Sequence, residues 1–106
     1  MPENYIQYLE ALANEDRIKI LKMLTGKSLC VQDIAQYIYL SRPTISYHLL
    51  LLKKLGLVKN SKNGKERYYS TNMGIVKECL KKLLHEFKLL YGKEECISCV
   101  MSVSGN

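Results

Sequence analysis

The sequence predicts a mainly α-helical domain with one small β-hairpin, and two features of the chain lead to this fold class. Apolar residues recur at helical spacing in several segments of the 106-residue chain, and the pair Asn63-Gly64 separates two short runs near its middle. Asn-Gly is a strong signal for a two-residue hairpin turn, because both residues tolerate positive φ. We therefore expect a single domain of about five helices and a two-stranded hairpin.

The first two helices are expected before Gly26, which suits the left-handed conformation that often ends a helix. Asn4 or a neighbour can cap the first helix, and the second runs from about residue 15 to residue 24. Tyr5, Ile6, Leu9 and Leu12 recur at helical spacing in the first helix. In the second helix, Ile18, Leu21 and Leu24 are expected to face inward.

Two further helices, joined by a tight turn, are expected between residues 28 and 55. The second of them begins at Ser41, a good N-cap, and Pro43 fits its first turn, where the missing N–H would be unpaired anyway. The inner residues are Val31, Ile34, Ala35 and Ile38 in the shorter helix, and Ile45, Leu49, Leu52 and Leu55 in the longer one. This pair is typical of a helix-turn-helix, although an ordinary helical bundle gives the same pattern.

A basic hairpin follows, with strands expected over residues 57–62 and 65–71. With Asn63 and Gly64 at the tip, the expected pairs are Val58 with Tyr69 and Asn60 with Arg67. The cations in or beside the hairpin are Lys59, Lys62, Lys65 and Arg67. A basic hairpin directly after a helix-turn-helix is typical of a wing that lies along DNA. We therefore interpret the fold as a winged helix-turn-helix, with a solvated hairpin of no binding role as the alternative.

A long amphipathic helix is expected from Met73 to Leu90, followed by a tail. Its broad apolar stripe consists of Val76, Cys79, Leu80, Leu83, Leu84, Phe87, Leu90 and Tyr91. The stripe could pack on its own domain, but in so short a chain we favour a dimer interface shared with the first helix. We assign residues 1–92 to a DNA-binding and dimerisation domain and residues 93–106 to a cysteine-containing tail.

Charge and composition narrow the classes of partner. The formal net charge is +6, which attracts phosphate backbones and anionic membranes alike. No secretory signal is visible, and the longest apolar run, residues 49–52, is far shorter than the roughly 20 residues that cross a bilayer. We expect a cytoplasmic protein without a membrane partner. Its four cysteines should then be reduced and available for metal or redox chemistry.

Several segments resemble the ArsR/SmtB family of metal-responsive repressors. Residues 12–21 resemble the family's opening, residues 28–35 its third helix and residues 40–49 its recognition helix, and the wing with Arg67-Tyr68-Tyr69 matches too. The resemblance covers about Tyr5 to Phe87. It implies a homodimer that binds a short inverted repeat in double-stranded promoter DNA. It also implies that an inducer releases the DNA and that a downstream gene is then expressed.

A recognition helix presents the N-terminal part of its exposed face to the major groove. The expected contacts are Arg42, Thr44, Ser46 and Tyr47, with His48 at the margin. Arg42 can make two hydrogen bonds to guanine. The wing residues Lys62, Lys65 and Arg67 are expected to neutralise phosphates without reading sequence. For His48, the alternative is a partly buried imidazole that hydrogen bonds to the backbone.

The metal-binding positions of the family are only partly kept. Arsenic-sensing relatives often carry three cysteines on the third helix, and the matching residues here are Cys30, Gln32 and Ala35. Zinc-sensing relatives use acidic and histidine residues of the last helix, and the corresponding residues here are Asn72, Gly74 and His85. The usual arsenic and zinc sites of the family are therefore not expected in this chain.

The tail offers a substitute site. Cys96 and Cys99 form a C-x-x-C pair, and Cys30 can complete a set of three thiolates, which suits arsenite. Cadmium, lead or zinc would take three or four such ligands. We therefore predict a thiol-binding inducer, arsenite or a soft divalent metal ion. The alternatives are a redox or persulfide switch through these thiols, and tail cysteines without a role. Cys79 is expected in the core or the dimer interface.

Other classes of protein remain as alternatives. A ligand-independent DNA-binding protein would ignore metals and thiol reagents, and a protein-interaction module would not distinguish specific from random DNA. An enzyme is not expected, because Ser46, Tyr47 and His48 are consecutive on a helix and point in different directions. No acidic pair or glycine-rich phosphate loop supports catalysis either.

Overall fold

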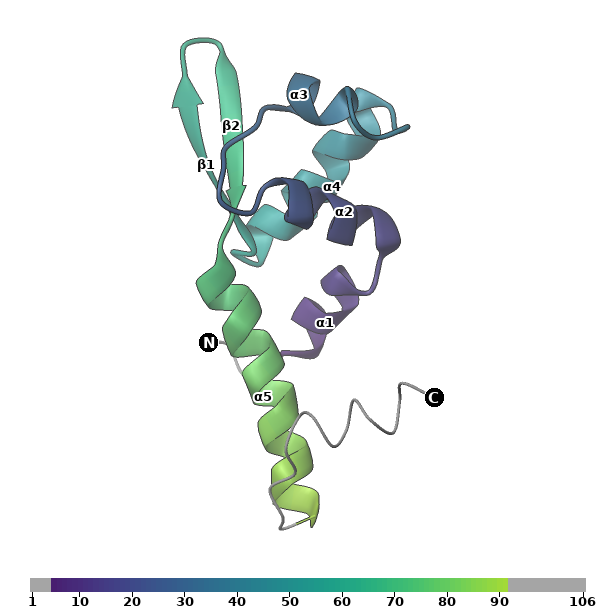
Figure 1. The fold of residues 1–106 in the computed structure, drawn as a ribbon, viewed down its shortest axis with the longest axis vertical. Helices are drawn as coiled ribbons and strands as arrows, with labels where there is room; N and C mark the ends of the chain where they lie inside the picture. Colours follow the sequence, from purple (N-terminus) through teal and green to yellow (C-terminus); the bar gives the residue numbers. More distant parts are fainter. Residues whose placement is uncertain (1–4, 92–106) are drawn as a thin grey trace.

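The computed structural model describes residues 5–91, and the side chains of residues 5–87. Over this range the chain forms five helices and one antiparallel two-stranded sheet (Figure 1). Their order is α1 (Ile6–Leu12), α2 (Glu15–Met23), α3 (Val31–Ala35), α4 (Arg42–Lys54), β1 (Val58–Asn63), β2 (Glu66–Thr71) and α5 (Met73–Tyr91). The predicted fold class is confirmed. The predicted tail, residues 93–106, lies outside the described residues.

Local sequence signals account for most helix ends. Asn14 caps α2, since its side-chain oxygen accepts a hydrogen bond from the backbone N–H of Arg17 at 3.1 Å. Gly26, with φ of 78°, follows α2 in the left-handed conformation that the sequence predicts. The expected cap Asn4 lies outside the described residues, and Tyr5 precedes α1 without a side-chain capping bond.

Helix α3 is shorter than predicted, because its last turn tightens. The backbone N–H groups of Gln36 and Tyr37 donate to the carbonyls of Asp33 and Ile34, three residues back, at 3.2 and 3.0 Å. Such bonds close a tighter turn than the α-helix does. The segment between α3 and α4 is therefore a turn of about five residues rather than the continuous helical pattern expected up to Leu40.

The hairpin turn lies one residue later than predicted. Asn63 pairs with Glu66, so the two turn residues are Gly64 and Lys65. Gly64 has φ of 69°, and no other residue type has positive φ in the described part of the chain. A positive φ at the first turn position alone is the pattern of a type II′ turn, whereas the predicted type I′ turn needs it at both.

The later turn changes the strand pairing. Val58 pairs with Thr71 and Asn60 with Tyr69, so the predicted pairs are wrong by two residues. A shift of two does not change which side chains of a strand share a face, because side chains alternate along a strand with a period of two.

Helix α4 lies at the centre of the hydrophobic core. Its inner residues Ile45, Leu49 and Leu52 have no exposed surface. They belong to one cluster with fully buried residues of the other elements: Ile20, Leu24, Ile34, Leu57 and Cys79. Burial of one such aliphatic side chain contributes about 1.5–3 kcal/mol, so this stripe fixes the rotation of α4 about its own axis. Ile18 and Leu55 were expected inward and are only partly buried.

The base of the hairpin is fastened to the helical body by backbone and side-chain bonds. Leu29 and Tyr69 exchange two backbone hydrogen bonds, of 3.0 and 2.8 Å. The buried hydroxyl of Thr71 donates to the backbone carbonyl of Leu21 at 2.7 Å. These contacts hold the end of β2 against α2 and against the segment that leads into α3.

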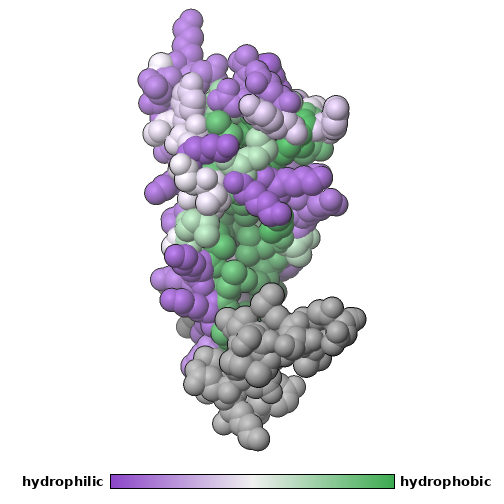
Figure 2. All heavy atoms as spheres, viewed as in Figure 1, coloured by the Kyte–Doolittle hydropathy of each residue, from purple (hydrophilic) through white to green (hydrophobic). Residues whose placement is uncertain are grey.

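Helix α5 extends from the body towards the end of the molecule opposite the hairpin tip (Figure 1). Cys79 on its inner face is fully buried, but Leu80, Leu84 and Phe87 are 52%, 43% and 50% exposed. Figure 2 shows hydrophobic residues gathered over α1 and α5, and hydrophilic ones around the hairpin end. None of the helices in residues 5–91 is long and apolar enough to span a bilayer.

We predict that the hydroxyls of Thr71 and Thr25 stabilise the fold together, because both donate to the carbonyl of Leu21 at 2.7 Å. Thr71→Val should lower the free energy of unfolding by about 1 kcal/mol, since its hydroxyl is buried. Thr25→Val should cost less, because Thr25 is exposed. The double variant should lose more than the sum, since the carbonyl then lacks both donors. Urea denaturation followed by circular dichroism measures this, and additive losses would contradict it.

Candidate nucleic-acid interface

The N-terminal half of α4 presents a polar face outward while its opposite face is buried. Arg42, Ser46 and Tyr47 are exposed, and Thr44 is half-buried. The start of the helix is held by Ser41, whose hydroxyl oxygen accepts from the backbone N–H of Thr44 at 3.3 Å. The Ser41 and Thr44 hydroxyls also lie 2.8 Å apart, within hydrogen-bond distance. The capped first half of α4 therefore carries the predicted major-groove residues Arg42, Ser46 and Tyr47.

The hairpin carries four cations and one acidic residue, Glu66, and no ion pair involves its cations among the described side chains. Lys62 and Arg67 lie directly opposite each other across the strands, and both are exposed, as is Lys65 in the turn. Like charges at opposed positions destabilise a hairpin. Among the side chains of residues 5–87, the one ion pair joins Lys19 to Glu15 within α2. The cations of the wing are therefore available to an anionic partner, which would relieve their repulsion.

The two groups of residues lie at the same end of the molecule. In Figure 1 the hairpin tip and the N-terminal part of α4 both lie at the end opposite the C-terminal part of α5. The start of α4, which carries Arg42, Ser46 and Tyr47, and the hairpin, which carries the wing cations, thus lie towards one end of the molecule. This geometry suits a surface that meets a double helix with a helix in a groove and a hairpin on the phosphate backbone.

His48 lies apart from this polar surface. It is 8% exposed, and its Nδ1 accepts a hydrogen bond from Nε of Arg17 on α2 at 3.2 Å. This burial does not fit the predicted place at the margin of the DNA-facing surface, and the bond goes to a side chain rather than to the backbone. Burial lowers the pKa of His48 from its usual 6.5, the nearby Arg17 charge lowers it further, and Asp16 partly opposes both.

Sequence reasoning missed two exposed aromatic side chains beside the start of α4. Tyr37 and Tyr39 lie in the turn after α3 and are 73% and 106% exposed, while Ile38 and Leu40 between and after them pack on the core. The alternation of tyrosine with aliphatic residues was the available signal. It was overlooked because the segment was interpreted as a continuation of the third helix.

The cysteines predicted to bind an inducer are only partly within the described range. Cys30 is 5% exposed and precedes α3, where its backbone N–H donates to the carboxylate of Asp33 at 3.2 Å. Cys79 is fully buried in the core, and burial raises the pKa of its thiol. Cys96 and Cys99 lie outside the described residues. Within the part that the structure describes, no three or more His, Cys, Asp or Glu side chains group closely enough to hold a metal ion.

The fold and its polar end define a winged helix-turn-helix regulator of transcription. A family model described as "Bacterial regulatory protein, arsR family" matches residues 14–60, which run from the cap of α2 into β1. The chain is also 40% identical over 87 residues to a cadmium resistance transcriptional regulatory protein CadC homolog of Staphylococcus aureus, a match that covers 80% of this chain and 72% of the relative. The chain therefore belongs to the ArsR family of DNA-binding transcription regulators.

Two further comparisons agree with this assignment. The chain is 31% identical over 75 residues to the arsenical resistance operon repressor of Staphylococcus aureus, covering 71% of this chain and 72% of the relative. The crystal structure of the transcriptional regulator HlyU from Vibrio vulnificus CMCP6 superposes with a TM-score of 0.61 at 34% identity, covering 77% of this chain and 84% of that one. The sequence-based resemblance to this family is confirmed.

Proposed function

We propose that the protein is a homodimeric repressor that binds an inverted-repeat operator and leaves it when an inducer binds its thiols. The observation that carries the DNA-binding part is the polar end. There the exposed face of α4 and the wing lie at one end of the molecule, and the wing cations form no ion pair with any side chain of residues 5–87. A basic surface built in this way gains affinity from phosphates, and its exposed helix face can read bases.

The proposed roles within this surface follow from exposure. Arg42, Ser46 and Tyr47 would reach base edges, with Arg42 the strongest candidate because it can pair with guanine through two hydrogen bonds. Thr44 would act near a phosphate, since its hydroxyl is already close to that of Ser41. Lys62, Lys65 and Arg67 would contact phosphates. His48 is left out of the proposed surface because it is buried.

The apolar face of α5 supports the homodimer. Leu80, Leu84 and Phe87 recur at spacings of four and three residues, so they lie along one side of the helix. All three are exposed in the single chain, as is Ile6 on α1. A patch of this kind on a small domain is typical of an association surface. A second copy with the same patch would cover it, and twofold symmetry would place two recognition helices on two half-sites.

The inducer is proposed to be arsenite or a soft divalent metal ion bound by Cys30, Cys96 and Cys99. Two relatives are named as regulators of cadmium resistance and of arsenical resistance, which supports this class of ligand. Cys30 is the residue directly before α3. A ligand bound to its sulfur would therefore lie at the start of the first helix of the helix-turn-helix. The inducer must bind the DNA-free dimer more tightly than the DNA-bound one. A thiol redox or persulfide switch is the alternative, and a thiolate sensor of either kind suits the reducing cytoplasm.

Arg42→Ala should relax base preference, because it removes two hydrogen bonds to a base and about 1–3 kcal/mol of discrimination. Lys65→Ala should weaken binding to all duplexes alike and reduce its salt dependence. Fluorescence anisotropy with the protein's own promoter and with a random duplex, over a range of salt, measures both. Equal losses on the two duplexes for Arg42→Ala would contradict the proposed contact.

The double variant Leu80→Gln/Leu84→Gln should shift the protein from dimer to monomer, because it makes the exposed apolar face of α5 polar. The matched control is Lys81→Gln/Lys82→Gln, which introduces the same residues at exposed polar positions of the same helix. Sedimentation equilibrium distinguishes the two. A wild-type protein that sediments as a monomer, or a dimer that survives the leucine changes, would refute the interface.

Arsenite or cadmium should release the reduced protein from its promoter, and Cys96→Ser/Cys99→Ser should abolish that release. Anisotropy titrations with arsenite, cadmium and zinc, repeated under mild oxidation, test the proposal. Cys79→Ser is the control, because the Cys79 thiol is buried in the core. Release on oxidation alone would favour the redox alternative. Tight binding that ignores every treatment would refute thiol sensing and leave DNA binding intact.

A further inference from the structure

Arg17 joins three helices through a single side chain. From its place in α2, its Nη1 donates to the backbone carbonyl of Ala11 at the end of α1, at 3.2 Å. Its Nε donates to Nδ1 of His48 in α4, also at 3.2 Å. In the part of the chain that the structure describes, no other side chain hydrogen bonds to both α1 and α4. A guanidinium can serve both partners because its donors form a rigid planar fork.

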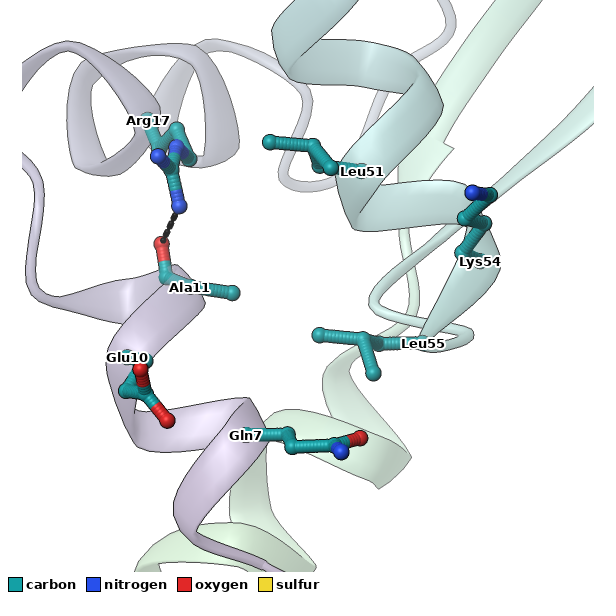
Figure 3. A pocket seen from close by; sticks show the side chains of 7 residues that line it. All are labelled: Gln7, Glu10, Ala11, Arg17, Leu51, Lys54 and Leu55. Atoms are coloured by element: carbon teal, nitrogen blue, oxygen red, sulfur yellow. Dashed lines mark hydrogen bonds between the residues drawn. The ribbon is translucent and has the colours of Figure 1, made fainter.

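An open pocket lies beside Arg17, between α1 and the second half of α4. It measures about 390 Å³ and lies between Gln7, Glu10 and Ala11 of α1 and Leu51, Lys54 and Leu55 at the end of α4 (Figure 3). Figure 3 shows Arg17 at the margin of this cavity, with its side chain directed to the Ala11 carbonyl. Tyr8 and Ala11 of α1 pack in the core cluster that includes α4, whereas side chains do not fill the space at this pocket. The hydrogen bonds of Arg17 supply a fixed link.

We propose that Arg17 and His48 are a positioning pair, which holds the recognition helix α4 at a set orientation to α1 and so aligns it with its DNA half-site. This inference rests on the proposed DNA-binding function. Helix α1 carries the exposed Ile6, and Figure 2 shows hydrophobic residues gathered over α1 and α5, which carries the proposed dimer interface. A link from α1 to α4 thus connects the orientation of the recognition helix to the geometry of the dimer.

The link depends on an uncharged imidazole. Nδ1 of His48 accepts the bond from Arg17, and a protonated ring has no free acceptor. Protonation would also set a positive charge against the guanidinium. The other charged groups around the pair are Asp16 on α2, and Glu10 and Lys54, which line the same pocket as Arg17. The ring centroid of Tyr47 on α4 lies 6.1 Å from that of His48. Asp16 opposes the effect of Arg17 but does not outweigh burial.

The direction of the pH effect follows. The folded arrangement lowers the pKa of His48 from 6.5, so the ring is neutral and the bond is formed at pH values above 6.5. States in which the pair is broken take up a proton more readily, so acidification below the ordinary pKa favours them. Specific DNA binding should therefore weaken as the pH falls from about 7.5 to 5.5, relative to a variant that keeps an acceptor at position 48 but cannot titrate.

The first experiment needs no DNA. Nitrogen NMR of the reduced full-length protein at neutral pH should find Nδ1 of His48 unprotonated and hydrogen bonded. During acidification, amide signals near Ala11 in α1 should shift with the same midpoint as the His48 ring. In His48→Gln those shifts should be absent, and in His85→Gln, which removes the other histidine, they should persist. A proton on Nδ1 at neutral pH, or α1 signals that ignore the ring, would overturn the positioning pair.

The second experiment measures affinity for the promoter and for a random duplex. His48→Leu should lower the ratio of specific to random affinity about tenfold, the effect of one lost hydrogen bond of roughly 1.4 kcal/mol. Arg17→Gln loses the bonds to both His48 and Ala11 and should lower the ratio at least as much. His48→Gln should keep the ratio at neutral pH, because its amide oxygen can accept from Arg17, and should flatten the pH profile. Lys22→Gln removes the same charge from an exposed position of α2 and should leave the ratio unchanged.

The outcomes distinguish a failure of the positioning pair from a failure of the proposed DNA-binding function. Thermal unfolding first establishes that each variant is folded at the temperature of the binding assay. A wild-type protein that prefers its promoter, with variants that keep the same ratio and pH profile, overturns the positioning pair and leaves the proposed function standing. A wild-type protein without preference for its promoter refutes the function, and the NMR shifts of α1 then decide the link between the helices on their own.

Discussion

The burial of one face of α4 is the constraint on which the other features depend. Ile45, Leu49 and Leu52 have no exposed surface, so the helix cannot rotate without opening the core. Ser46 and Tyr47, on the opposite face of the helix, are consequently held on the outside. Here the helix that organises the core is also the one that we propose meets the DNA.

Much of the fold could be predicted from the sequence because its signals are local. The caps Asn14 and Ser41 and the terminating Gly26 act within a few residues of their own position. The hairpin turn is different. Gly64 fits both type I′ and type II′ turns, and the choice follows from distant contacts: Tyr69 bonds to Leu29 and Thr71 to Leu21. Those contacts fix the position of β2, and the turn has to conform to it.

The residues of the polar surface also differ in whether the sequence alone could place them. Helical spacing was enough to place Arg42, Ser46 and Tyr47 outward, because the buried stripe determines the opposite face. It was not enough for His48, which lies at the edge of that stripe and is drawn inside by Arg17, 31 residues earlier in the chain. No pattern in a single sequence marks such a partner. The cysteines of the tail lie outside the described residues, so their role rests on the chemistry of thiols alone.

The backbone bonds between Leu29 and Tyr69 have a consequence for how such a regulator can diversify. They fasten the base of the wing to the residue just before Cys30 and α3, while the hairpin tip projects beyond this anchor (Figure 1). If the wing binds phosphates as we propose, substitutions at the tip would alter that contact without disturbing the helices. Substitutions on the outer side of α4 would likewise alter the proposed base contacts without moving the wing. Affinity and sequence choice are thus open to separate evolutionary adjustment within one small domain.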